Sequence, residues 1–347
     1  MGRGPTEERL VIIMVGLPAR GKTYIARKIG RYLDWLGYRA RVFNVGDYRR
    51  QRLGAHHPSS FFDHENARGL NLRLQMADAA LHDMIHWFSL GGEVAIYDAT
   101  NTTKERRLHL REKCQQANLR VVYVESICED PALVEANIRA TKLQSPDYEG
   151  MDPDEAVRDF RARIAHYERI YEPITADDVT YIKYIDVGRR IIVNRIQGYV
   201  PGKVLFFLMN THLIPRPIYL TRHGESTFNV ENRIGGDAAL TPSGWRYAEL
   251  LSAFLREKIG PTVVPPVLTS TLQRTMDTAS HLPWPTTPWK LLDEIDAGIC
   301  NGLTYDQISA RLPNEFAARA ADKFNYRYPN GESYRDVIAR VDPVIIE

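Results

Sequence analysis

LVIIMVGLPARGKTY, residues 10–24, joins an apolar strand to a glycine loop. Residues 10–15 are apolar without interruption, as is typical of a parallel strand that is covered on both faces. Residues 16–23 match the phosphate-binding pattern G-x-x-x-x-G-K-[ST], and apolar residues at helical spacing follow them. Strand, loop and helix therefore occur in the order that a cradle for nucleotide phosphates requires.

The residue types of the glycine loop fit this interpretation. Gly16 and Gly21 let the backbone turn tightly and bring its N–H groups close to phosphate oxygens. Lys22 can reach the β- and γ-phosphates of a nucleotide, and the hydroxyl of Thr23 is a candidate ligand of Mg²⁺. The loop therefore predicts a nucleotide site that works with Mg²⁺.

Composition limits the class of protein. A length of 347 residues suggests two domains, and 44% apolar with 25% charged residues is ordinary for a globular protein. The formal net charge of +2 gives no reason to expect nucleic acid or a membrane surface as a partner. Cys114, Cys128 and Cys300 lack metal-type spacing, so a reducing cytoplasm is the expected location.

Apolar runs alternate with helical patterns in the first part of the chain. Six strands are predicted, at residues 10–15, 41–45, 94–97, 119–125, 181–185 and 190–196. Asp47–Arg50 is assigned to a loop. The alternation predicts an α/β fold, with a parallel sheet that carries helices on both faces.

Pro215-Arg216-Pro217 interrupts this pattern and marks a domain boundary. The predicted domains are residues 1–214 and 215–347. The second is expected to be another α/β unit, which opens with a strand at Ile218–Leu220 and runs directly into Thr221–Glu225.

Asp98 ends an apolar strand, where a carboxylate can hold Mg²⁺ or accept the proton of an attacking hydroxyl. An aspartate at a strand end is by itself more often a turn or a helix cap, but here it accompanies a phosphate-binding loop. Scattered cations could bind the phosphate of a phosphorylated acceptor, although each alone is more typical of a solvated surface. These cations are Arg49, Arg73, Arg106, Lys142 and Arg163.

Arg222-His223-Gly224-Glu225 is the second chemical motif. A histidine beside a phosphate-binding arginine can attack phosphorus and form a phosphohistidine that water later cleaves. Arg274 can supply a second cation, and Glu294 is the candidate general acid, with a pKa that partial burial would raise. Alone, a histidine at a strand end is more often structural.

Four segments closely resemble the bifunctional 6-phosphofructo-2-kinase/fructose-2,6-bisphosphatase family. They are Gly16–Tyr24, VFNVGDYRR at residues 42–50, DATNTTKERR at residues 98–107 and IDVGRR at residues 185–190. The resemblance implies that ATP contacts Gly16–Tyr24, including Gly16, Gly21, Lys22, Thr23 and Tyr24, and a second stretch from Asn137 to Lys142. It implies fructose 6-phosphate contacts at Arg49, Arg73, Thr100, Arg106, Lys142, Arg163 and Tyr167. It also nominates Asp98 and Cys128 as active-site residues, and we interpret Cys128 as shaping the ATP site because phosphoryl transfer to a sugar hydroxyl needs no thiol nucleophile.

The second half is similar to the histidine phosphatase superfamily, a phosphoglycerate mutase-like α/β fold, through RIGGD at residues 233–237 and YRYPNGESY at residues 326–334. The resemblance implies fructose 2,6-bisphosphate contacts at Arg222, Asn229, Gly235, Arg274, Tyr305, Arg319, Lys323 and Tyr334. The family also has a second pocket histidine on a strand beyond the helix that includes Val337–Ile346. No histidine follows Tyr334 here, so we expect an incomplete domain with weak or absent phosphatase activity.

The resemblance therefore implies a cytoplasmic enzyme that uses ATP and Mg²⁺ to make fructose 2,6-bisphosphate and carries a domain built to hydrolyse it. Its expected partners are these small molecules, without nucleic acid or membrane, and a homodimer is one option. A kinase with an inert phosphatase-like appendage stays open as an alternative. So does a non-catalytic metabolite-sensing protein, although Lys22, Thr23 and Asp98 argue against it.

Overall fold

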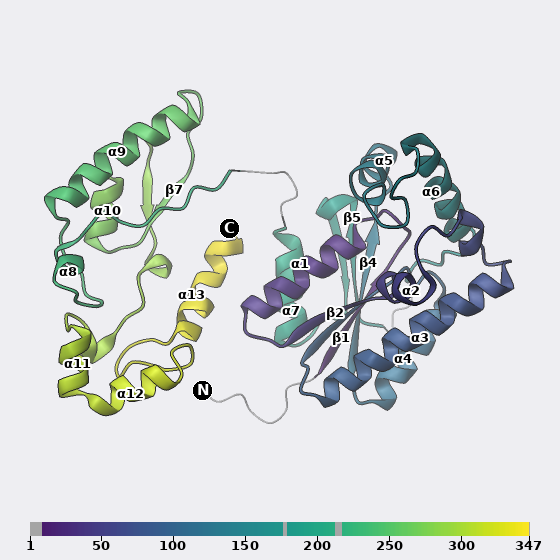
Figure 1. Cartoon of the computed structure of the whole chain (residues 1–347), viewed down its shortest axis with the longest axis horizontal. Helices are drawn as coiled ribbons and strands as arrows, with labels where there is room; N and C mark the ends of the chain where they lie inside the picture. The colour runs from purple at the N-terminus through teal and green to yellow at the C-terminus, as the bar shows by residue number, and fades with distance from the viewer. Residues whose placement is uncertain (1–8, 176–178, 212–216, 347) are drawn as a thin grey trace. The chain divides into compact units, whose positions relative to one another are not determined.

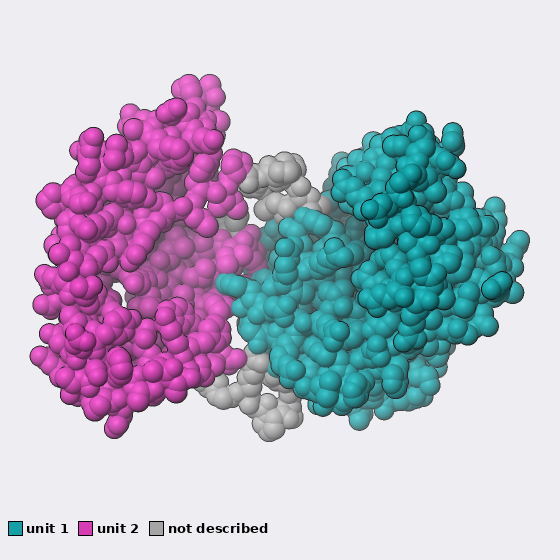
Figure 2. All heavy atoms as spheres, viewed as in Figure 1, with its two compact units in different colours: residues 1–213 teal, residues 214–347 magenta. Residues whose placement is uncertain are grey.

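The computed structural model describes residues 9–175, 179–211 and 217–346, without the side chain of Lys142. The chain divides into two compact units, Met1–Leu213 and Ile214–Glu347, which are coloured separately in Figure 2. No helix among the described residues combines the length and apolarity needed to cross a membrane.

The first unit is built on a six-stranded sheet with the order β2-β3-β1-β4-β5-β6. Figure 1 shows helices around this sheet. The strands are β1 (Leu10–Val15), β2 (Ala40–Asn44), β3 (Val94–Asp98), β4 (Arg120–Ile127), β5 (Tyr181–Ile185) and β6 (Arg190–Asn194). Five strands are parallel, as predicted, whereas β6 pairs with β5 in the antiparallel direction. That antiparallel pairing corrects the expectation of a purely parallel sheet. Only a short turn joins β5 to β6, and a parallel connection needs a crossover of a dozen or more residues.

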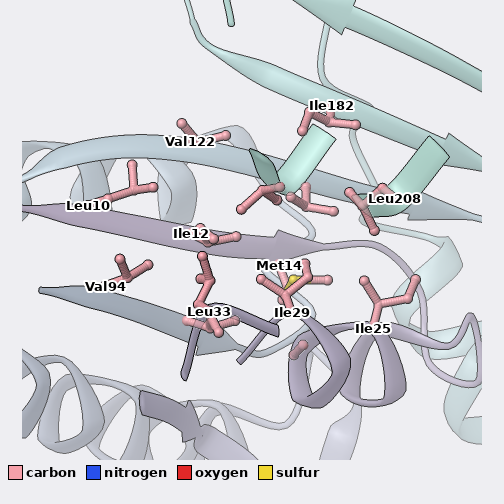
Figure 3. Close-up of a cluster of buried hydrophobic side chains, with 14 of the residues drawn as sticks. Leu10, Ile12, Met14, Ile25, Ile29, Leu33, Val94, Val122, Ile182 and Leu208 are labelled. Atoms are coloured by element: carbon pink, nitrogen blue, oxygen red, sulfur yellow. The ribbon is translucent and has the colours of Figure 1, made fainter. Parts of the chain in front are cut away.

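Strand β1 is central and buried along its whole length, which explains its uninterrupted apolar sequence. On one face of the sheet, Leu10, Ile12 and Met14 pack against helices α1 (Lys22–Trp35) and α7 (Tyr199–Met209), as Figure 3 shows. Ile29 and Leu33 of α1 enter the same cluster. The period of two along β1 sends the alternate residues to the other face.

Helices α3 (Ala67–Ser89) and α4 (Lys104–Gln116) cover that other face. Val11, Ile13 and Val15 pack there against Met84 of α3 and Leu110 of α4. The predicted arrangement of helices on both faces of the sheet is therefore confirmed.

The remaining helices of this unit surround the carboxyl ends of the parallel strands. They are α2 (Val45–Leu53), α5 (Pro131–Asn137), a π-helix (Ile138–Lys142), α6 (Pro153–Glu168) and two short 3₁₀ turns (Ser59–Phe62 and Asp186–Gly188). The assignment of Asp47–Arg50 to a loop is wrong, because these residues form the body of α2. The side chain of Asn44 caps that helix by accepting a hydrogen bond of 3.0 Å from the backbone N–H of Asp47.

The second unit is described from residue 217 to residue 346. Its helices are α8 (Thr227–Val230), α9 (Pro242–Ile259), α10 (Gln273–Ala279), α11 (Tyr305–Arg311), α12 (Pro313–Ala321) and α13 (Tyr334–Ile346). Strands β7 (Val267–Thr269) and β8 (Thr286–Pro288) form a parallel pair. The predicted strand at Ile218–Leu220 is wrong: no described strand pairs with it, and Ile218 and Leu220 are 80% and 93% exposed.

Candidate active sites

The glycine loop lies at the carboxyl end of the central strand, where parallel α/β sheets place their ligand sites. Gly16 has a φ of 132°, and a Cβ atom there would lie 2.3 Å from the carbonyl oxygen of Ser126. Gly21, with a φ of 77°, turns the chain into α1. The loop therefore needs both glycines, as the sequence predicts, and Lys22 follows at the start of the helix.

A cavity of about 1450 Å³ opens beside this loop. It gathers most of the residues predicted for the first site, and those that line it are Gly21, Lys22, Thr23, Tyr24, Arg49, Arg73, Asp98, Thr100, Arg106, Cys128, Asn137, Arg163 and Tyr167. Gly16 is outside this lining but donates its backbone N–H to the carbonyl of Thr100 at 2.9 Å. Lys142 also belongs to the prediction, but its side chain is outside the described part of the chain.

Several contacts hold the nucleotide side of the cavity in shape. Asn137 donates to the carbonyl of Ala19 at 3.1 Å, and the hydroxyl of Ser126 donates to the carbonyl of Arg20. Lys22 is buried and donates from Nζ to the carbonyl of Leu17 within its own loop. These bonds place the ammonium group of Lys22 and the predicted contact residue Asn137 around the same loop.

Cys128 lines the cavity as a buried thiol. Burial raises the pKa of its thiol above the usual value, and the nearby Asp186 and Asp130 carboxylates act in the same direction. A raised pKa disfavours the thiolate, which is the nucleophilic form of cysteine. Its environment therefore fits a residue that shapes the site and does not attack phosphorus.

Asp98 ends β3 beside Asn44, which ends the neighbouring strand β2. The amide of Asn44 donates from Nδ2 to a carboxylate oxygen of Asp98 while its Oδ1 caps α2. The backbone donor from Asp47 fixes the orientation of this amide, because only its oxygen can accept. Asn44 is not among the residues predicted for the site, although a helix-capping residue after a strand is a signal visible in the sequence.

Two of the predicted sugar-phosphate arginines are held by hydrogen bonds to neighbouring residues. Arg106 donates to the Tyr97 hydroxyl at 3.1 Å and pairs with Asp78 at 3.1 Å. Burial raises the pKa of Tyr97 to about 12, so this hydroxyl stays neutral beside the guanidinium. Arg73 donates to the hydroxyl of Tyr167 and, at 3.0 Å, to the backbone carbonyl of residue 63.

The other two arginines of this set meet at a buried carboxylate that the sequence did not reveal. Asp147 accepts hydrogen bonds from Nη2 of Arg49 at 2.6 and 2.5 Å, and Arg163 approaches it to 3.6 Å. Burial opposes ionisation of Asp147, but the hydrogen bonds and the charges of Arg49 and Arg163 outweigh it and lower its pKa. No local pattern could link Asp147 to Arg49, because 98 residues separate them in the chain.

A second group of predicted residues surrounds His223 in the second unit. Nδ1 of His223 lies 2.7 Å from the carbonyl oxygen of Gly224, so Nδ1 carries the hydrogen and Nε2 carries the lone pair of the neutral ring. Burial lowers the pKa of His223 below its usual value, and the positive charges of Arg274 and Arg222 lower it further, against the effects of the Gly224 bond and Glu294. The imidazole is therefore held neutral, as a nucleophile requires.

Arg274 and Glu294 form an ion pair of 2.6 Å beside this histidine. The guanidinium is 4% exposed and also donates to the carbonyl of Gly236 at 2.7 Å. The carboxylate of Glu294 keeps 49% of its surface exposed. The structure thus brings together the predicted nucleophile, cation and acid.

The remaining predicted contacts of the second unit fall into separate small groups. Arg319 donates to the hydroxyls of Tyr305 at 3.1 Å and Tyr328 at 2.6 Å, and the ammonium of Lys323 lies 5.9 Å from the ring centre of Tyr334. Asn229 completes the capping box of α8 with Ser226. Gly235, with a φ of 60°, precedes the carbonyl that Arg274 binds.

Comparison with known proteins assigns both units. The sequence profile of 6-phosphofructo-2-kinase matches residues 2–215, and that of the histidine phosphatase superfamily (branch 1) matches residues 218–347. The fold is accordingly a kinase domain followed by a histidine phosphatase domain, both of the α/β class.

Three relatives are named 6-phosphofructo-2-kinase/fructose-2,6-bisphosphatase. The one from Gallus gallus is 48% identical over 97% of this chain and 72% of its own length. The one from Caenorhabditis elegans is 47% identical over 97% of this chain and 76% of its own length. The one from Arabidopsis thaliana is 48% identical over 99% of this chain, which spans only 47% of that relative. This chain therefore belongs to the 6-phosphofructo-2-kinase/fructose-2,6-bisphosphatase family.

Proposed function

We propose that the first unit transfers the γ-phosphoryl group of ATP to the 2-hydroxyl of fructose 6-phosphate. The observation that supports this most strongly is the single cavity of about 1450 Å³, which is lined both by the glycine loop and by arginines for a sugar phosphate. A nucleotide site alone would not need this second set of cations. The kinase profile and the named relatives agree with the proposal.

The residues of this cavity have distinct tasks in the proposed reaction. The backbone of the glycine loop and Lys22 bind the ATP phosphates and neutralise charge on the transferred group. Arg49, Arg73 and Arg163 hold the sugar phosphate, which turns the sugar hydroxyl toward the nucleotide. Asp98 accepts the proton of that hydroxyl as its oxygen forms the new bond to phosphorus and the bond to ADP breaks.

We also propose that the site works with Mg²⁺. Thr23 and Asp98 both line the cavity and offer a hydroxyl and a carboxylate, the oxygen donors that Mg²⁺ prefers. Bound Mg²⁺ would supply positive charge that neutralises the nucleotide phosphates. Because Mg²⁺ keeps several water ligands, two protein donors are enough for such a site.

For the second unit we propose a site built to hydrolyse fructose 2,6-bisphosphate through a phosphohistidine. Arg274 turns from Glu294 to the 2-phosphate, and Glu294 takes up a proton from water. Nε2 of His223 then attacks the phosphorus, the bond from phosphorus to the sugar oxygen breaks, and protonated Glu294 gives that oxygen its proton. Water then cleaves the phosphohistidine and releases phosphate. Arg222 and Arg274 stabilise the charge of the transferred group.

The kinase proposal can be tested by incubating the protein with Mg²⁺-ATP and fructose 6-phosphate and assaying an acid-labile bisphosphate. We expect product from the unmodified protein and a loss of at least about 10²-fold in kcat for Lys22→Ala, because its ammonium acts on the transferred phosphoryl group. A Lys22→Ala variant with unreduced kcat would contradict the assignment. ATP binding without any product would favour the alternative of a metabolite sensor.

The phosphatase proposal has its own readout. Fructose 2,6-bisphosphate labelled at the 2-phosphate should leave label on His223, and His223→Ala should abolish this label while kinase activity stays. A protein that makes the bisphosphate but traps no label would favour the alternative of a kinase with an inert appendage.

Two further proposals concern the setting of the enzyme. We propose a reducing cytoplasm, supported by the three cysteines, all of which are buried free thiols. We propose a homodimer, supported by the edge strand β6, on which Ile192 and Val193 are 39% and 43% exposed. Light scattering at micromolar concentration would contradict the latter if it gave the mass of one chain.

A further inference from the structure

Asp147 lies between the arginines that two different helices deliver to the sugar-phosphate site. Arg49 comes from α2 and uses one nitrogen, Nη2, to contact both carboxylate oxygens. Arg163 comes from α6, and its Nη1 lies 3.6 Å from the same carboxylate, as does Nη1 of Arg50. The side chains of Arg49 and Asp147 are only 5% and 6% exposed. One buried carboxylate is therefore shared by three guanidinium groups.

The charge of this cluster suits an anionic ligand. Three guanidinium groups meet the carboxylate of Asp147, and Arg50 also pairs with Asp47 at 2.5 Å, so the net charge is 3 − 2 = +1. A phosphate monoester carries about −1.5 to −2 at pH 7 and is attracted by such a charge. Asp147 therefore lowers the positive charge of the cluster without removing it.

Arg163 depends on its neighbours for orientation. Its guanidinium carbon lies 3.6 Å from the centre of the Phe62 ring, which fixes the plane of the group on one side. Its Nε is buried and has no hydrogen-bond partner within the described structure. The Tyr148 hydroxyl also hydrogen-bonds this guanidinium, but Asp147 is the carboxylate that links it to Arg49. Loss of Asp147 would therefore remove the contact that sets the two guanidinium groups relative to each other.

Asp147 itself is held in place by the packing of the residue that follows it. The next residue, Tyr148, is 4% exposed, packs against Phe160, and donates its hydroxyl to Asp159 at 2.8 Å. Its backbone N–H also donates to the carbonyl of Ser145 at 3.0 Å. The carboxylate therefore has a fixed position against which the longer and more flexible arginine side chains can be set.

We propose that Asp147 is a positioning residue for the sugar-phosphate site: it fixes Arg49 and Arg163 in the arrangement that binds the phosphate of the acceptor. The inference rests on the proposed kinase function and adds a residue that touches the arginines and not the sugar. Two physical effects oppose each other here. The negative charge of Asp147 repels a phosphate, so charge alone predicts that Asp147→Asn tightens substrate binding. Positioning predicts that the same substitution weakens it.

The sign of the change decides between these effects. For Asp147→Asn we expect the KM for fructose 6-phosphate to rise by about tenfold or more, because an amide cannot accept from Arg49 on both of its heavy atoms. The KM for ATP and the kcat at saturating sugar phosphate should change by less than about threefold. Calorimetric titration with fructose 6-phosphate should show the same loss of affinity without turnover.

Asp78→Asn is the matched control. Asp78 also pairs with a predicted sugar-phosphate arginine, Arg106, but its side chain is 54% exposed. Solvent-exposed ion pairs contribute little, so its KM for fructose 6-phosphate should stay within about twofold of the unmodified protein. An equal rise in KM for both variants would contradict a positioning role specific to Asp147, because the loss of any carboxylate near an arginine would then have the same effect.

An unchanged or lower KM for Asp147→Asn overturns the proposal. If that variant does not fold, Asp147→Glu carries the test: it keeps the charge but moves the carboxylate by one methylene, so positioning predicts a raised KM and charge alone predicts none. Failure of the inference differs from failure of the proposed function. In the first case the unmodified protein still makes the bisphosphate, and in the second it makes none.

Discussion

His223 shows how one side chain is prepared for chemistry by its surroundings. Its Nδ1 donates to the carbonyl of Gly224, which leaves Nε2 with the lone pair. The backbone N–H of Gly224 in turn donates to the hydroxyl of Thr278 at 2.9 Å, so helix α10 holds the residue next to the histidine. These hydrogen bonds fix the ring through Nδ1 and do not involve Nε2, which we propose as the nucleophile.

The lowered pKa of His223 predicts how the second site responds to pH. Burial and the charges of Arg274 and Arg222 favour the neutral ring, so we expect phosphohistidine formation to persist as pH falls from 7 to about 6.5, where an ordinary imidazole is half protonated. Between about 6.5 and the lower folded pKa the unfolded chain binds the proton more readily, so acid also destabilises this unit. An NMR titration, with the His223 signal identified from His223→Gln, should give a midpoint below 6.5. A midpoint above that value would contradict the assignment of its surroundings.

At the scale of elements, the turn from β1 into α1 places a strict demand on the sequence. Glycine readily adopts the φ of 132° found at Gly16, whereas residues with a side chain rarely do. An added Cβ would also collide with the carbonyl of Ser126 on the adjacent strand β4. The Cβ is fixed to one backbone and the oxygen that it would meet belongs to another, so no flexible side chain can move to relieve the collision. The shape of the phosphate loop is thus tied to the register of the central sheet.

Gly16→Ala should therefore lower both the stability of the first unit and its affinity for ATP. We expect a loss of roughly 1–3 kcal/mol in the free energy of unfolding, measured by denaturant titration, together with weaker ATP binding. Gly202→Ala is the control, since this glycine lies inside α7 with open space around it and should be neutral or stabilising by up to about 1 kcal/mol. Equal stability of the two variants would contradict the steric argument.

Elements with a strong local pattern could be predicted from the sequence, and those set by distant partners could not. Strand β1 and helix α1 follow from apolar periodicity, and Asp98 ends β3 as expected. The buried residue of helix α2 is Arg49, which is held by an ion pair and not by apolar packing. The helix therefore has no apolar stripe, and its sequence shows no helical periodicity. Ile218–Leu220 has the composition of a strand, but a strand also needs a neighbour to bond with.

The same distinction applies to the candidate sites. The loop glycines, Lys22 and His223 belong to local motifs, and the resemblance of other segments to the family supplied the scattered arginines. Asn44 and Asp147 belong to no motif, because their roles come from contacts across 54 and 98 residues of sequence. Such partners emerge only when the sheet has brought the ends of its strands together.

At the scale of the whole molecule, the chain joins two units that carry separate sets of chemical groups. The glycine loop, Asp98 and Asp147 all lie within Met1–Leu213, whereas His223, Arg274 and Glu294 all lie within Ile214–Glu347. Each unit also has its own buried cluster: residues of β1 and α1 in the first, and Cys300, Ile308 and Tyr328 in the second. The groups proposed for synthesis and for hydrolysis of one metabolite thus lie in two different compact units.

This separation predicts that ATP stabilises one unit only. A ligand at about 100 times its Kd stabilises the fold that binds it by about 2.7 kcal/mol, and this gain is confined to the parts that unfold with the site. In hydrogen exchange followed by mass spectrometry, saturating Mg²⁺-ATP should slow exchange in β1, β3 and α1 and leave α9 and α10 unchanged. Lys22→Ala at the same nucleotide concentration is the control and should lose most of this protection. If α9 and α10 were protected equally, the two units would unfold together. That result would contradict the prediction that ATP stabilises the first unit alone.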